Sequence, residues 1–240
     1  MPQIDHSATV AQIVTEHAAA ARVFQKHGID YCCHGNVTVP QACLDGRLDP
    51  EALFAELEAE LVRGDAQAEE NPSALSTSAL IARIIDRHHG YLRRALPYIA
   101  PVMAKVAKVH AARGANLQGL HETFSDLAAN LGPHLDEEEE VLFPALMART
   151  PDSEVVKREL GRMHEDHLAV GGLLARIRTL TDGFTTPPWG CNTYRVLMAE
   201  LDALEADILR HVHLENHVLA PRFGALATRA ASMPSLEARP

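Results

Sequence analysis

The sequence is poor in aromatic residues, in cysteine and in long apolar runs. Phe, Trp and Tyr make up 5% of the 240 residues, and stretches that alternate apolar and polar residues are few, which argues against a β-sheet fold. No apolar run approaches the ~18 residues of a membrane-spanning helix, and the N-terminal residues lack the pattern of a signal peptide. Four cysteines, two of them adjacent, form a poor disulfide framework for this length. We therefore expect a protein of the reducing cytoplasm with no membrane role.

Basic residues are also scarce. The chain has 22 Lys and Arg against 32 Asp and Glu, for a net charge of −10. Nucleic acids and anionic membranes both attract a net basic surface, so we expect neither as a partner. Histidine is the residue in excess, with 14 copies.

Apolar residues recur at helical spacing through most of the chain, which predicts an all-α fold. The first helix is expected from Thr9 to Lys26, ending at Gly28. Pro97 and Pro101 are expected to kink or split a later helix, and Pro133 to kink one or start a new segment. Short connections between the later helices favour an up-down four-helix bundle. The expected parts are a small helical N-terminal domain (1–63), a linker (64–76), the four-helix bundle (77–224) and a loose tail (225–240).

Each of the four long helical segments places one histidine on its predicted core face. That face follows alternating steps of three and four residues. It includes Ala82 and Ile85 in the first segment, and Val141 and Ala145 in the second. In the first segment the spacing favours His89 only slightly over its neighbour His88. The four histidines on these faces are His89, His134, His167 and His211.

Two of these histidines are followed four residues later by a glutamate, Glu138 or Glu215, on the same helix face. The rest of the acidic run around Glu138 is expected to be a solvated face. A buried unpaired carboxylate costs several kcal/mol, and Lys and Arg are nearly absent from these faces. A lone core histidine is usually just a hydrogen-bonded residue, but two Glu and four His together favour a bound cation. A metal-free structural bundle is the alternative, and it leaves two buried Glu unexplained.

Imidazole and carboxylate ligands suit iron, manganese or zinc, and six ligands exceed one tetrahedral zinc site. Two ions about 3.5–4 Å apart, bridged by both carboxylates, would use all six. A single ion stays as the alternative. A histidine-rich site with few carboxylates favours iron binding or redox exchange over strong O2 activation. Two ferrous ions and two carboxylates leave a charge that a bridging hydroxide or oxide would balance.

The adjacent pair Cys32 and Cys33 is the second chemical feature. Adjacent cysteines close only a small, strained ring when oxidised, so such a bond would be easily reduced. The pair is either two small, half-buried apolar residues or a thiolate pair that takes iron, receives nitric oxide or relays electrons. His34 could help to lower a thiol pKa. Cys43 could join the pair in space, and Cys191 is expected to be structural.

The order of these motifs resembles the iron–sulfur cluster repair di-iron proteins, the repair-of-iron-centres family, in which a hemerythrin-like domain follows a domain with paired cysteines. The motifs are Gly28-Ile-Asp-Tyr-Cys-Cys-His-Gly-Asn36, His134-x-x-x-Glu138, Met163-His-Glu-Asp-His167 and His211-Val-His-Leu-Glu215. The resemblance implies six iron ligands, and it selects His89 over His88. They are His89, His134, Glu138, His167, His211 and Glu215, with the two glutamates as bridges.

The resemblance also implies a function. It is the restoration of iron–sulfur clusters damaged by nitric oxide or peroxide, with iron passed from the bundle through Cys32 and Cys33. The expected partners are apo or damaged iron–sulfur proteins, with nitric oxide or O2 as small ligands. An iron donor of this kind would not be an enzyme in the usual sense. Two alternatives stay open, a nitric oxide reductase at the di-iron centre and an O2 or NO sensor. The N-terminal domain could dock on its own bundle or on a second chain in a homodimer.

Overall fold

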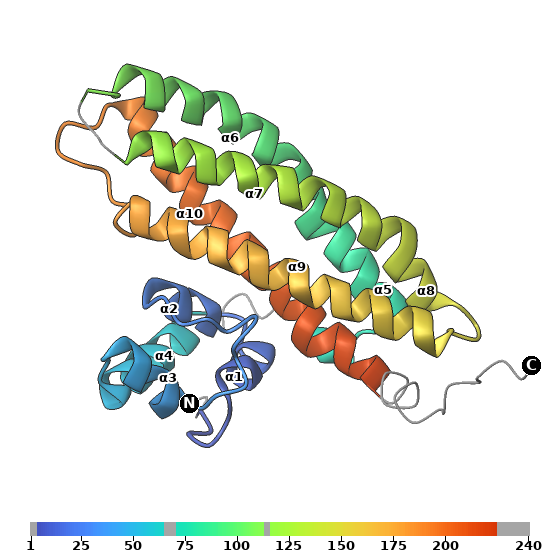
Figure 1. The fold of residues 1–240 in the computed structure, drawn as a ribbon. Coiled ribbons are helices and arrows are strands. Elements are labelled where there is room, and N and C mark those ends of the chain that lie inside the picture. Colours follow the sequence, from blue (N-terminus) through green and yellow to red (C-terminus); the bar gives the residue numbers. More distant parts are fainter. Residues whose placement is uncertain (1–3, 65–70, 113–115, 225–240) are drawn as a thin grey trace, which may run out of the picture.

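The structure is a computed structural model that describes residues 4–64, 71–112 and 116–224 (Figure 1). Within these ranges every regular element is a helix, apart from one isolated bridge between Thr9 and Thr38. The all-α prediction is therefore confirmed. None of the described helices has an apolar stretch long enough to cross a bilayer. The whole predicted tail, residues 225–240, and part of the predicted linker, residues 65–70, lie outside the described residues.

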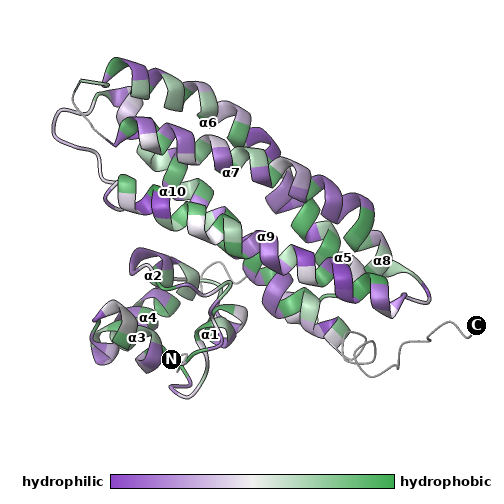
Figure 2. Ribbon diagram, viewed as in Figure 1, coloured by the Kyte–Doolittle hydropathy of each residue, from purple (hydrophilic) through white to green (hydrophobic). Residues whose placement is uncertain are grey.

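Four long rods lie side by side, and successive rods run in opposite directions (Figure 1). This arrangement is the predicted up-down four-helix bundle. Hydrophobic and hydrophilic residues both recur along each rod (Figure 2), as helices with one buried face require. Rod 1 is α5 (Thr77–Arg83), a π-helical turn (Ile84–His89) and α6 (Gly90–Val109); rod 2 is α7 (Leu117–Glu137), a π turn (Glu138–Leu142) and α8 (Phe143–Met147); rod 3 is α9 (Ser153–Leu180); rod 4 is α10 (Asn192–His213), a π turn (Leu214–Leu219) and a 3-10 turn (Ala220–Phe223).

The π turns of rods 1 and 2 move the buried face of their rods by one residue. A π turn holds an extra residue, so the helical period slips where it occurs. In rod 2 the predicted core residue Val141 is 38% exposed, and Leu142 and Leu146 are buried instead. In rod 1 the predicted Ala82 is exposed and Ile85 is half-buried. The core prediction was wrong at these positions because it assumed an unbroken α-helical period.

Proline does not interrupt the rods. Pro97 and Pro101 lie inside α6, which runs unbroken, and Pro133 lies inside α7. All three prolines are exposed, so the backbone carbonyl that loses its partner faces water rather than the core. The expected split of rod 1 at its prolines is wrong, and His134 keeps its place on α7.

The N-terminal part holds α1 (Val10–Glu16), α2 (Ala20–Lys26), α3 (Val39–Gly46) and α4 (Pro50–Gly64). Thr9 begins α1 with a reciprocal pair of hydrogen bonds to Gln12. The single helix expected from Thr9 to Lys26 is two helices, because His17 leaves the helical conformation. Gly28 ends α2 with a φ of +66°, as predicted. The sequence analysis missed α3.

These N-terminal helices dock on their own bundle. α2 contacts α10, and α1 contacts the π turn at Leu214–Leu219. One apolar core contains buried residues from both parts, among them Phe24 and Ile208. At the edge of this contact, the buried carboxylate of Glu205 accepts a hydrogen bond from Arg178 Nε (3.0 Å) and one from Gln25 Nε2 (3.0 Å).

Replacing Glu205 with alanine is expected to lower the free energy of unfolding by about 2–3 kcal/mol, because Arg178 loses its carboxylate partner in a largely buried place. This loss is smaller than that for breaking a fully buried ion pair, because the Arg178 side chain is 24% exposed and water partly screens its charge. Chemical denaturation measures the change. The matched control is Arg63→Ala, which removes an ion pair whose arginine is 74% exposed and should change stability by less than about 1 kcal/mol. Equal losses in the two variants would contradict this role for Glu205.

Candidate metal centre

The six predicted ligand residues meet inside the bundle, and all four rods contribute. His89 is the last residue of one π turn, Glu138 is the first of the next, and Glu215 lies in the third. π turns are frequent at functional sites, since the wider turn lets side chains point where a regular helix would not. All six side chains are at least 94% buried, namely those of His89, His134, Glu138, His167, His211 and Glu215.

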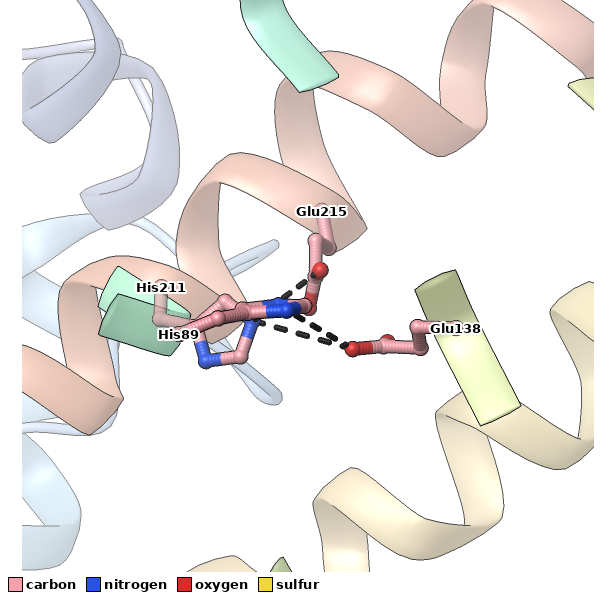
Figure 3. Close-up of side chains that lie close together, drawn as sticks. All are labelled: His89, Glu138, His211 and Glu215. Carbon is pink, nitrogen blue, oxygen red and sulfur yellow. Dashed lines mark hydrogen bonds and ion pairs between the residues drawn. The ribbon is translucent and has the colours of Figure 1, made fainter. Parts of the chain in front are cut away.

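One half of the site pairs His89 with His211 (Figure 3). Their Nε2 atoms are 3.1 Å apart. His89 Nε2 lies 3.4 Å from Glu138 Oε2, and His211 Nε2 lies 3.0 Å from Glu215 Oε1. The four ligand atoms of this group lie within 4.8 Å of one another, so the group could hold a metal ion.

The other half pairs His134 with His167. His134 Nε2 lies 3.3 Å from Glu138 Oε1, and His167 Nε2 lies 3.2 Å from Glu215 Oε2. These atoms also lie within 4.8 Å of one another. Each carboxylate therefore turns one oxygen to the first histidine pair and the other oxygen to the second. This is the arrangement of two neighbouring cation sites that share two carboxylates.

Three of the four histidines are oriented by a hydrogen bond at the far side of the ring. Nδ1 of His89 lies 2.8 Å from Glu139, and Nδ1 of His134 lies 3.2 Å from Asp166. An acceptor at Nδ1 holds the ring proton there and leaves the Nε2 lone pair facing the site. The third such partner is the amide of Asn216, at His167.

His88 lies outside both groups. Its Nδ1 is 2.9 Å from Asp207 Oδ1, and its ring stacks on His211 with centroids 5.8 Å apart. The structure thus places His89 in the site, as the family resemblance implied, and His88 behind it. Both histidines are buried, and both lie at the end of the π turn Ile84–His89.

Sequence reasoning missed the outer partners Glu139, Asp166 and Asn216. Glu139 was expected to be part of a solvated face, yet it contacts His89. Each of the three is the immediate sequence neighbour of a candidate ligand. A neighbouring helix residue points about 100° away, toward the adjoining rod. A polar residue directly next to a candidate ligand in the sequence is therefore the signal by which these three partners could have been found.

The site fits a cationic group. Among the described residues, Nε2 of His134 and His167 and both oxygens of Glu138 and Glu215 are buried without a hydrogen-bond partner. Burial, with repulsion from Glu215, holds the pKa of Glu138 well above its usual range. Burial also lowers the pKa of His211 to about 3, so its imidazole is neutral and able to act as a ligand. Buried lone pairs and carboxylates that face each other are costly unless a cation lies between them.

Cys32 and Cys33 lie against the bundle beside this site. The Cys33 sulfur is 3.8 Å from the backbone oxygen of His167 and 3.7 Å from the Cys32 sulfur. The Cys32 thiol donates to Cys33, which lowers the pKa of Cys33 and raises that of Cys32. With Asp30 they form a third group whose ligand atoms lie within 4.8 Å of one another.

Three expectations about the cysteines and His34 are corrected. His34 contacts Asp30 (2.6 Å) rather than a thiol. Cys43 is buried on α3 and belongs to none of the three groups found among the described residues. Cys191, expected to be structural, is exposed.

Cys191 has a neighbour that activates it. Its sulfur lies 3.4 Å from His110 Nε2, and it precedes the first turn of α10. Hydrogen bonds from His110 and from the backbone of Tyr194 lower the pKa of Cys191 to about 7. We expect its alkylation rate to rise with pH around a midpoint near this value, because the thiolate is the reactive form. Mass spectrometry of the Cys191 peptide measures the rate. In His110→Ala the midpoint should move toward the ordinary thiol value, and an unchanged midpoint would contradict the assignment.

Comparisons with known proteins agree with this architecture. Residues 80–223 match the family described as "Hemerythrin HHE cation binding domain", and residues 6–61 match ScdA_N, described as "Domain of Unknown function (DUF542)". The first match covers more than half of the chain. The chain therefore belongs to the hemerythrin HHE cation-binding family, and the predicted family resemblance is confirmed.

Particular relatives match nearly the whole chain. It is 34% identical to "Iron-sulfur cluster repair protein ScdA" of Staphylococcus haemolyticus over 222 residues, which are 92% of this chain and 99% of that protein. It is 32% identical to "Iron-sulfur cluster repair protein YtfE" of Yersinia pseudotuberculosis and of Yersinia pestis over 203 residues, which are 85% of this chain and 90% of those proteins.

Proposed function

We propose that this chain is a di-iron protein that restores damaged iron–sulfur clusters by supplying iron. The observation that carries the proposal is the pair of buried carboxylates, Glu138 and Glu215, each turned toward two histidine pairs at once. The names of the relatives, iron–sulfur cluster repair proteins, support the choice of substrate.

Each iron would be held by one histidine pair, with both carboxylates shared between the two ions. His89 and His211 would hold one ion, and His134 and His167 would hold the other. A bridging hydroxide or oxide would balance the remaining charge. When bound, the iron supplies an exchangeable metal ion, since imidazole and carboxylate hold it less firmly than a cage of thiolates.

The chain's own residues prepare this exchange. Glu139 and Asp166 hold protons on the far nitrogens of His89 and His134, which keeps the inward nitrogens free to bind. Cys33, beside His167, offers a softer ligand on the route to a client cluster. Iron is the cargo, and its transfer as a ferrous ion needs no electron donor.

In this function the cysteine-bearing domain (1–63) passes on iron that the bundle (77–224) holds. The partners are apo or damaged iron–sulfur proteins of the cytoplasm. The cysteines contact their own bundle, so one chain holds both parts of the proposed route.

The test combines metal analysis with cluster restoration. Protein made in iron-rich medium should contain two irons per chain, with the Mössbauer signature of a coupled pair. Added without oxygen, together with sulfide and a thiol reductant, to a [4Fe–4S] protein damaged by nitric oxide, it should restore the cluster while losing iron; sulfide and reductant without this chain should not restore it. Steady nitrous oxide production with a reductant and no restoration would instead indicate a nitric oxide reductase. A stable oxygenated form without iron loss would indicate a sensor.

A further inference from the structure

The backbone oxygen of Cys32 is held by two side chains of the bundle. Asn216 donates to it through Nδ2 (2.9 Å), and His217 Nε2 lies 2.9 Å from it. Both donors lie on the π turn Leu214–Leu219, which also contains Glu215. The cysteine loop is therefore attached to the same turn that presents a candidate bridging carboxylate.

Asn216 also determines which nitrogen of His167 carries the proton. A backbone oxygen can only accept a hydrogen bond, so the amide nitrogen of Asn216 must face Cys32. The amide oxygen then faces His167 Nδ1, at 3.1 Å, and can only accept. Nδ1 must donate, and the lone pair of His167 is left on Nε2, which faces Glu215.

A second contact joins the cysteine pair to His167. The Cys33 thiol lies 3.8 Å from the backbone oxygen of His167, and the histidine is 1% exposed. The two adjacent cysteines are thus connected to both ends of one residue, to its ring through Asn216 and to its backbone directly. His217 contacts the same Cys32 oxygen, but no contact joins it to His167 among the described residues.

We propose that Asn216 is a positioning residue that couples occupancy of the metal centre to the position of the cysteine loop. The proposal rests on the metal site of the proposed function. A metal at Nε2 keeps the His167 proton on Nδ1 and so keeps the chain of hydrogen bonds to Cys32. Without a metal the proton can move to Nε2 with no change of charge, Nδ1 no longer donates, and the loop loosens. By linkage, a loop held in place also favours metal binding.

The test is the alkylation rate of Cys33, read from its peptide by mass spectrometry, in metal-free protein and in protein loaded with Fe2+ without oxygen. In the wild-type chain, loading should slow alkylation by about fivefold, the effect of one net hydrogen bond. In Asn216→Ala, loaded with saturating Fe2+, the loaded and metal-free rates should become equal while the metal content at saturation stays the same. Asn216→Asp keeps an acceptor for His167 and loses the donor to Cys32, so it should behave like Asn216→Ala even if the alanine variant folds poorly.

His217→Ala is the matched control, since it removes the other contact to the same oxygen and should keep the difference between the two rates. A retained difference in Asn216→Asp, or an equal loss in His217→Ala, would overturn the proposal. The assay contains no client protein. If the wild-type chain failed to restore clusters but kept the difference between its loaded and metal-free alkylation rates, the proposed function would be contradicted and the coupling would still hold.

Discussion

A chain with Glu138 replaced by leucine is expected to bind at most one metal ion and, when metal-free, to be more stable than the metal-free wild type. The wild-type interior contains two buried carboxylates with no hydrogen-bond partner among the described residues. Replacing a buried carboxyl group that lacks a hydrogen-bond partner by an apolar side chain of similar size is stabilising, here by about 2 kcal/mol. That gain corresponds to roughly 5 °C in the unfolding midpoint of a chain this size. Metal analysis and calorimetry after chelation measure the two effects.

Glu159→Leu is the control for this substitution. Glu159 is also buried on the bundle, but its carboxylate is paired with Arg158 and Arg162, each at 2.7 Å. Its loss should leave the metal content unchanged and lower the stability, the opposite sign to Glu138→Leu. Two metals per chain in Glu138→Leu, or a less stable metal-free form, would show that Glu138 is not a shared ligand.

The double variant Cys32→Ser, Cys33→Ser is expected to keep its full metal content and to restore damaged clusters roughly tenfold more slowly or worse, because a serine hydroxyl stays protonated where a thiolate would bind. The cysteines lie outside the buried His–Glu groups, so the stored metal should be unaffected. Following cluster absorbance with time measures the rate.

Cys191→Ser serves as the control, because it removes an exposed thiol that belongs to none of the groups found in the described part of the chain. Its restoration rate should equal that of the wild type. A double variant that restores clusters at the wild-type rate would remove the thiols from the transfer route.

The sequence was enough to predict the rods and which residues converge. Helical spacing placed His134, His167 and His211 on core faces, and the scarcity of basic residues on those faces made a cation the simplest explanation. All six candidate ligands meet in the structure. Their role as ligands stays a prediction.

Spacing alone could not reveal the π turns, because an inserted residue leaves no mark in composition. The period slips between Ile84 and His89, where the sequence could barely separate His88 from His89. It slips again at Glu138–Leu142, where Val141 was wrongly assigned to the core. Both errors lie beside candidate ligands, where the helix departs from its regular form.

Docking of the cysteine loop depends on long-range contacts that no local pattern encodes. Asn216 and Cys32 are 184 positions apart. Only the fold brings the amide of one to the carbonyl of the other, so the sequence could suggest a thiol relay but not its position.

The apolar core that continues from the N-terminal helices into the bundle has a further consequence. Buried surface, rather than the length of a tether, determines how far the thiols lie from the histidines. The thiols are thus presented at a fixed effective concentration, which dilution of the protein does not change. A handover within one chain would then follow first-order kinetics, and only the meeting with a client would depend on how much protein is present.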